Sequence, residues 1–286
     1  MPAPLESVSE IRRDQLRALM NMWWWAGMVL VPLVAGGVVT ALLANRNPAV
    51  VFVAVVVATA LAGLIATYAL ADSRAKSAYL PAWARSRGWN VGVGMWRESA
   101  TPLLRDGDRR NSEDHVYGPL AGGGEAALCH YTYEVREETT DAKGNTTTHW
   151  EEHPFTVVET GVVTPGISRL TLHPRSFGDI RLFDRIDSKL TSDRVVELES
   201  SELEKEYKLE VADSDSDMAV RLLFEPAFIV WCLDRAGILF EIEQQTLVVA
   251  LAGHSYDATE LDRLVGDAGT IAARLADAGA TIPKEA

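Results

Sequence analysis

The chain has 286 residues with 40 acidic and 27 basic side chains, which gives a formal net charge of −13 at pH 7. A protein this acidic does not neutralise phosphates, so nucleic acid is excluded as an expected partner. Only two cysteines occur, Cys129 and Cys232, and both lie in apolar runs. We expect reduced, buried thiols, which excludes a small domain stapled by disulfides.

Two uncharged apolar segments lie near the N-terminus. Met22–Ala44 and Ala49–Ala71 each contain 23 residues without Asp, Glu, Lys or Arg. At about 1.5 Å per residue, either segment as a helix is long enough to cross a hydrocarbon core of about 30 Å. We therefore predict a transmembrane hairpin over residues 22–71, after an N-terminal tail over 1–21. A cleaved signal peptide fits less well, because its apolar core runs only about 7–15 residues.

Basic residues flank this hairpin unevenly and predict its orientation. Three arginines precede the first span and four basic residues follow the second, whereas Arg46 alone lies in the turn. Because Lys and Arg are enriched in cytoplasmic flanks, we expect a multi-pass protein of the inner (plasma) membrane with both termini cytoplasmic. Ten side chains are predicted to gather at the inner membrane interface: Trp23, Trp24, Trp25, Tyr68, Arg74, Lys76, Tyr79, Trp83, Arg85 and Arg87.

Residues 72–97 form the predicted juxtamembrane amphipathic segment. A helix over Asp72–Arg87 would carry Trp83 on its apolar face. Pro81 is expected to kink or restart this helix, and Gly88 suits its end. Two interpretations stay open for the apolar face. It either rests on lipid headgroups or packs on the soluble domain and buries Trp83.

The remainder, residues 98–286, is expected to be a mixed α+β soluble domain with long antiparallel β-hairpins. Either one domain or two lobes, over 98–190 and 191–286, would fit its length. Residues 98–116 resemble a loop. From Glu125 the apolar positions alternate with polar ones, as in a half-buried strand, and Asp141–Gly144 is a good turn. Further strands are predicted at Ser168–Leu172, Arg194–Leu198, Ile238–Ile242 and Thr246–Leu251, whereas Phe177–Lys189 is ambiguous.

Two helical regions are predicted in the last third of the chain. Met218–Ala236 reads as an apolar helix that Pro226 interrupts. Leu261–Leu275 carries an amphipathic pattern, and Thr259-x-x-Asp262 before it resembles a capping box.

One motif has the spacing of a zinc protease. His149-Trp150-Glu151-Glu152-His153 matches H-x-x-E-H, but that chemistry needs both histidines on one face of a helix. Here the motif falls on the predicted return strand, where residues four apart are separated by roughly 13 Å. One zinc ion with bonds of about 2.1 Å does not reach both rings. We expect outward polar positions and no metal.

A second motif begins like a calcium loop. Asp213–Asp217 reads D-x-D-x-D, but Met218 and Phe224 replace the glycine and the bidentate glutamate that such a loop requires. A linker that leads into a helix is the better interpretation. With no further constellation, we expect no catalytic, cofactor-binding or metal-binding residues.

A series of short motifs follows in order between about residues 80 and 255. The motifs are Gly118-x-x-x-Gly122, Tyr131-x-Tyr133, His153-x-Phe155-Thr156-Val157-Val158, Leu172-x-Pro174, Leu203-x-x-x-Tyr207-x-Leu209 and Val220-Arg221-Leu222-Leu223-x-x-Pro226. This order resembles that of uncharacterised bacterial two-span membrane proteins that carry a cytoplasmic domain of unknown function. The resemblance implies architecture alone.

The absence of a catalytic motif favours a non-enzymatic function. We expect a membrane-anchored cytoplasmic interaction or sensing domain, with the lipid bilayer and either a protein partner or a second copy as its contacts. One alternative is a membrane-bound hydrolase whose site assembles only in three dimensions, from His130, His149, His153 or His173. Another alternative is a subunit of a larger membrane complex.

Overall fold

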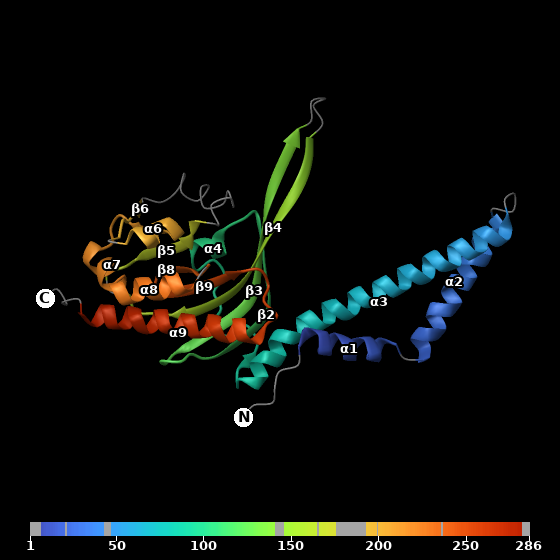
Figure 1. Cartoon of the computed structure of the whole chain (residues 1–286), viewed down its shortest axis with the longest axis horizontal. Coiled ribbons are helices and arrows are strands. Elements are labelled where there is room, and N and C mark those ends of the chain that lie inside the picture. Colours follow the sequence, from blue (N-terminus) through green and yellow to red (C-terminus); the bar gives the residue numbers. More distant parts are fainter. Residues whose placement is uncertain are drawn as a thin grey trace. The chain divides into compact units, whose positions relative to one another are not determined.

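The computed structural model describes residues 7–20, 22–42, 47–140, 146–164, 166–175, 193–198, 200–235 and 237–281. They belong to two compact units, Met1–Ala82 and Trp83–Ala286 (Figure 1). The predicted turn at Asp141–Gly144 and the ambiguous segment Phe177–Lys189 lie outside the described residues.

The first unit is helical. It contains α1 (Val8–Leu19), α2 (Met22–Leu42) and most of α3 (Pro48–Ser86). Within the described residues, α3 is the one helix long and apolar enough to cross a membrane, and α2 contributes a shorter apolar stretch, Ala26–Ala41. Membrane association is therefore supported by one candidate span, whereas the second span and the orientation of the termini stay predictions.

Helix α1 falls in the segment that the sequence predicted only as a tail. Ser7 begins it with a capping box, in which its hydroxyl accepts from the Glu10 amide and its own amide donates to the Glu10 carboxylate. Within the same unit, Arg12 donates to the Tyr68 hydroxyl at 2.7 Å and pairs with Asp72 at 2.8 Å. These contacts hold α1 beside α3.

Helix α3 runs through Pro81 without interruption, so the helix does not restart there. Its end agrees with the prediction, because Gly88 follows with a positive φ of 73°.

The second unit is built on a nine-stranded antiparallel sheet in the order β1-β2-β3-β4-β9-β8-β5-β7-β6. The strands are β1 (Asn90–Val91), β2 (Arg109–Pro119), β3 (Glu125–Thr140), β4 (Thr146–Gly161), β5 (Arg169–Pro174), β6 (Asp193–Val195), β7 (Tyr207–Ala212), β8 (Leu239–Glu243) and β9 (Thr246–Ala252). The helices are α4 (Pro102–Arg105), α6 (Ser201–Glu206), α7 (Asp217–Leu223), α8 (Pro226–Asp234) and α9 (Ala258–Thr281). The α+β class is thus confirmed.

Strands from both halves of the soluble part alternate in this sheet. β4 pairs with β9, and β5 pairs with both β7 and β8. The described strands on either side of residue 190 therefore belong to one sheet.

Most predicted elements of this unit are confirmed. The long hairpin is β3–β4, the strands at 168–172 and 238–251 are β5, β8 and β9, and Pro226 opens α8 directly after α7. The loop predicted over residues 98–116 is wrong, because α4 and the start of β2 lie there. The residues that begin β2 are mostly polar and exposed, since one face of this outer strand is open to water.

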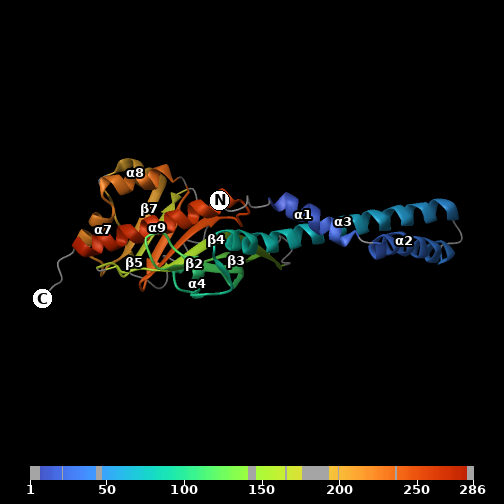
Figure 2. The ribbon, with the colours of Figure 1, turned by 90° about the horizontal axis from the view of Figure 1, so that it is seen from below.

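The two faces of the sheet have different covers. α7, α8 and α9 pack on one face, where Phe240 contacts the rings of Phe224 and Phe228. Residues 92–106, which include α4, lie on the other face. This segment is named the strap below. Trp96, Leu103 and Leu104 of the strap are buried with Tyr131 and other residues of the sheet. Figure 2 shows α8 and α4 on opposite sides of the sheet.

Candidate functional site

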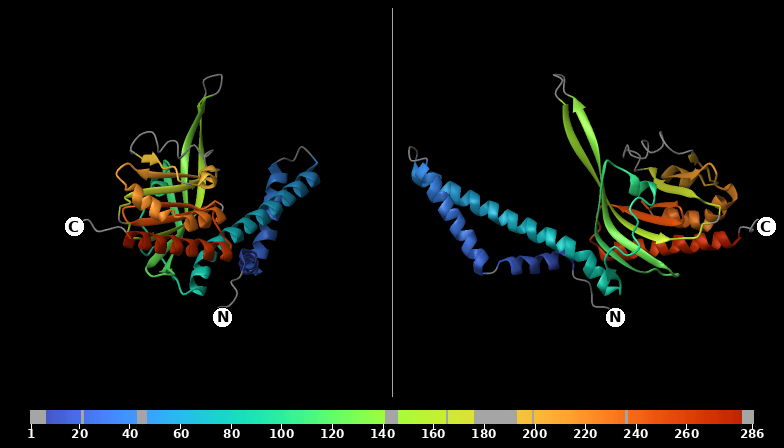
Figure 3. Two further views of the ribbon diagram at one scale, coloured as in Figure 1. Left: turned by 60° about the vertical axis from the view of Figure 1, so that its left-hand side comes forward. Right: turned by 180° about the vertical axis from the view of Figure 1, so that it is seen from behind.

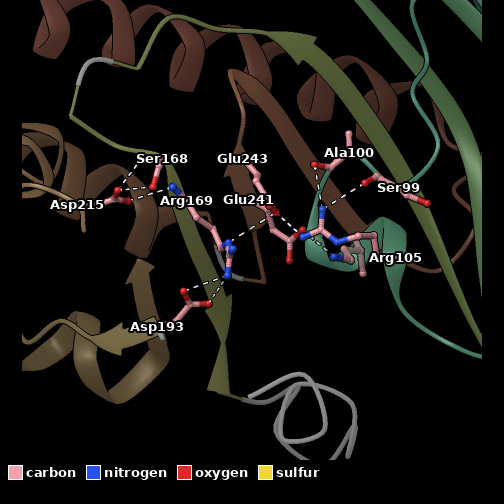
Figure 4. A network of polar contacts seen from close by, with 10 residues as sticks. Ser99, Ala100, Arg105, Ser168, Arg169, Asp193, Asp215, Glu241 and Glu243 are labelled. Atoms are coloured by element: carbon pink, nitrogen blue, oxygen red, sulfur yellow. Dashed lines mark hydrogen bonds and ion pairs between the residues drawn. The ribbon is translucent and has the colours of Figure 1, made fainter. Parts of the chain in front are cut away.

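Buried carboxylates fasten the strap to the sheet. Glu159 on β4 accepts a hydrogen bond from the Arg97 amide at 2.9 Å, and Glu241 on β8 accepts one from the Leu103 amide at 2.8 Å. Arg105 of the strap pairs with Glu243, two residues further along β8. Figure 4 shows Arg105 beside both β8 glutamates, with its guanidinium also donating to the carbonyls of the strap.

This network continues across the sheet. Arg169 on β5 lies 3.7 Å from Glu243 and pairs with Asp193 on β6 at 3.0 Å (Figure 4). Asp215 accepts from the amides of Ser168 and Arg169 and from the Ser168 hydroxyl. Side chains from the strap, β5, β6 and β8 are thereby tied to the loop that precedes α7.

Burial changes the acidity of two of these groups. Glu159 is 1 % exposed and Glu241 is 0 % exposed. Desolvation disfavours the charged form and raises the pKa of each carboxyl group from 4.5 to about 7, although the bonds from the strap amides oppose the shift. Both groups are sealed from solvent and held by backbone amides. Their arrangement serves to position the strap, and it does not present an acid to a substrate.

A cavity of about 340 Å³ lies where the strap meets β2 and β3. Trp96 and Tyr131 form its aromatic part, and Glu98, Asp108 and Arg110 supply charges. The hydroxyl groups of Ser99 and Ser112 also line this cavity, and the Ser112 hydroxyl lies 3.1 Å from Nε2 of His115. None of the four histidines of the hydrolase alternative is among the described residues that line it.

The four histidines of the hydrolase alternative are spread over three strands, β3, β4 and β5. His130 on β3 is buried between the Asp114 carboxylate at 3.2 Å and the Ser255 carbonyl at 3.1 Å, and it stacks on His254. His149 and His153 lie on β4 and His173 lies on β5. The ranges that the structure describes contain no group of three His, Cys, Asp or Glu placed to hold a metal ion.

Both sequence motifs have the local structure that was predicted. His149 and His153 lie on a strand, β4, and the acidic run Asp213–Asp217 leads into a helix, α7. Ser216 caps this helix by accepting from the Ala219 amide, and Asp217 in its first turn pairs with Arg194.

The distal part of the β3–β4 hairpin extends beyond both neighbouring strands and is named the arm below (residues 136–140 and 146–152). β2 pairs with β3 only as far as Glu134, and β9 pairs with β4 only from Phe155. The β3–β4 ladder nevertheless continues to the pair Thr140–Thr146. Figures 1 and 3 show this ribbon projecting beyond the rest of the sheet.

The arm is acidic and polar. It carries four glutamates and one arginine, a formal charge of −3 with histidine neutral; the charged residues are Arg136, Glu137, Glu138, Glu151 and Glu152. Arg136 pairs with Glu138. At the base of the arm the Arg109 guanidinium lies 3.8 Å from the centre of the Trp150 ring, which holds this aromatic side chain in place.

The predicted interface residues are found in varied surroundings. Tyr68, Arg74, Lys76 and Arg85 are exposed, Trp24 is half-buried and Tyr79 is buried, and the side chains of Trp23 and Trp25 are outside the described set. Trp83 is 1 % exposed, and its indole donates to Asp262 within the soluble unit at 2.9 Å. Arg87 donates to both oxygens of Asp262. Trp83 was expected either to rest on lipid headgroups or to be buried in protein, and in the structure it is buried in protein.

Sequence reasoning missed the buried acids and the reach of the arm. Glu241 and Glu243 alternate with Phe240 and Ile242, and the alternation gives no sign that both faces are covered. The lengths of the two strands are a signal that could have indicated the arm. β3 and β4 have 16 residues each, more than any other strand of the sheet.

Comparison of the chain with protein-family models, with curated proteins and with solved structures finds no match.

Proposed function

We propose that this protein is a membrane-anchored, non-enzymatic interaction module whose arm engages a protein partner on the cytoplasmic side. The observation that carries the proposal is the β3–β4 ladder, which extends past the ends of both neighbouring strands. A two-stranded ribbon alone is only marginally stable in water, and its open edges are templates for another strand. Contact with a partner gives such a ribbon the support that the sheet does not provide.

The anchor is the second part of the proposal. Residues 22–71 form a two-helix hairpin in the inner membrane, with α3 as its longer helix and both termini in the cytoplasm. The uncharged length of both segments and the basic flanks support this arrangement. Tyr68, Arg74 and Lys76 are exposed on α3 near the end of the second span, which suits the headgroup level. The lipid bilayer is thus the constant contact of the protein.

Photo-crosslinking in intact membranes tests the interaction. A photoreactive amino acid replaces Thr147 in the arm, and the matched control replaces Glu202, which is equally exposed but lies on α6. We expect one discrete adduct from position 147 and none from position 202. Adducts of the same kind from both positions, or none from any arm position, would contradict the proposal.

A further inference from the structure

We propose that the outer edge of β4 takes up an extended, basic segment of a partner polypeptide as an additional antiparallel or parallel strand. This inference rests on the proposed function and specifies the partner of the same arm. It concerns the edge of β4 from Thr146 to His153, which no strand of the described residues covers.

The hydrogen-bonding direction of this edge follows from its last covered residue. Gly253 donates from its amide to the Pro154 carbonyl at 2.8 Å, so the main-chain polar groups of Pro154 point toward β9. Alternate residues of an antiparallel strand point the same way, and the β3–β4 register continues from there to Thr146 without a shift. Thr146, Thr148, Trp150 and Glu152 therefore direct their amides and carbonyls away from β3 and toward the open edge.

The charges beside this edge select the partner. Glu151 and Glu152 lie on β4 itself, and Glu137 and Glu138 lie on the paired strand. The one cation of the arm, Arg136, is already paired with Glu138. Glu137 and Glu151 share one face of the ribbon, and Glu138 and Glu152 share the other. An incoming strand with Lys or Arg at alternate positions would place its cations on one face, beside one of these two pairs, which is the favourable cross-strand combination.

A second copy of this chain fits the edge poorly. In an antiparallel contact that uses the whole open edge, Glu151 and Glu152 of each copy would lie opposite threonines of the other, so a second copy would bring no cation to the glutamates of the arm. The whole chain has a net charge of −13, so long-range repulsion acts in the same direction. The partner is therefore a different, basic polypeptide.

Binding of designed peptides to the full chain in neutral detergent tests the inference. The probe is a twelve-residue acetylated peptide of alternating Lys and Thr, and the reporter is the emission of the Trp150 ring beside the edge. Two matched peptides serve as controls, one with Glu in place of Lys and one with alternate backbone amides methylated. We expect saturable binding of the Lys-Thr peptide that weakens with salt, and affinity at least about tenfold lower for both controls.

Two variants separate the edge from the charge. Thr148→Pro removes an amide that points to the open edge and leaves the bonds to β3, so we expect it to abolish peptide binding without unfolding the arm. Glu151→Gln with Glu152→Gln should weaken binding at low salt by about tenfold and remove most of the salt dependence. The pattern of amide exchange in β3 verifies that the arm of each variant is intact.

The possible failures are distinguishable. Equal binding of the Lys-Thr and methylated peptides would overturn strand addition, and equal binding of the Lys-Thr and Glu-Thr peptides would overturn the basic partner. Absence of peptide binding together with a discrete adduct at position 147 would overturn this inference and leave the proposed function standing. Self-association that depends on Thr148 would show that the occupant is a second copy, which also overturns it.

Discussion

Glu241 shows how a single buried acid couples the strap to pH. Its carboxyl group is completely buried, accepts a bond from the Leu103 amide and has a pKa raised to about 7 by desolvation. In the unfolded chain the same group titrates near 4.5. Between these values the folded state binds more protons, so the stability of the protein falls as the pH rises through this range.

We expect Glu241→Gln to stabilise the protein above pH 7. The wild-type carboxyl group loses about 3 kcal/mol of folding stability between pH 4.5 and pH 7, because each pKa unit corresponds to about 1.4 kcal/mol. Gln keeps an acceptor for the Leu103 amide and carries no charge. Urea unfolding of the full chain in neutral detergent at pH 5 and pH 8, followed by tryptophan fluorescence, checks this. A variant that is less stable than wild type at pH 8 would contradict the prediction.

At the scale of the element, the residue that caps the N-terminus of α9 differs from the predicted one. The sequence predicted capping by Thr259, but Asp257 accepts from the amides of Thr259 and Glu260 and is the residue that caps the helix. These bonds hold the pKa of Asp257 below its usual value. The error arises because both residues are good caps, and only the path of the chain from β9 determines which one precedes the first turn.

Substitution of Asp257 and of Thr259 shows which of the two residues caps α9. We expect Asp257→Ala to lower the melting temperature by about 2–4 °C and Thr259→Ala to change it little. Because the pKa of Asp257 is lowered in the folded state, its contribution is complete above the usual pKa of Asp and is lost as the pH falls through the lowered value. Thermal unfolding of both variants at pH 7 and pH 3 measures this. An equal decrease in melting temperature for both variants at pH 7 would contradict the assignment of Asp257 as the cap.

Elements with strong local periodicity were predictable, and elements that depend on neighbours were not. Apolar and polar residues of β3 alternate from Cys129 to Arg136, and Pro226 marks the start of α8. β2 was missed because Arg109–Asp114 is polar throughout and forms a strand only by pairing with β3. The candidate interaction site likewise depends on neighbouring elements and could be predicted only in part. The arm was predicted as part of a hairpin, whereas its open edge depends on where β2 and β9 end.

At the scale of the whole molecule, the sheet order lies beyond the reach of sequence patterns. β4 pairs with β9 over a long separation in the chain, and β5 is flanked by β7 and β8. Such pairings depend on tertiary packing, which local periodicity does not encode. The candidate membrane span is the opposite case. Its length and lack of charge are evident in the sequence, and α3 contains the predicted second span.

Cysteine labelling in intact cells tests the proposed membrane anchor and the proposed cytoplasmic location of the arm together. The two native thiols, Cys129 and Cys232, are 0 % exposed and should not react in the folded protein. Asn47, directly before α3, and Thr147 in the arm are exposed positions for new cysteines. With a membrane-impermeant maleimide, we expect Asn47→Cys to react in intact cells and Thr147→Cys to react only after permeabilisation. Labelling of Thr147→Cys from outside, or protection of Asn47→Cys until permeabilisation, would contradict the account.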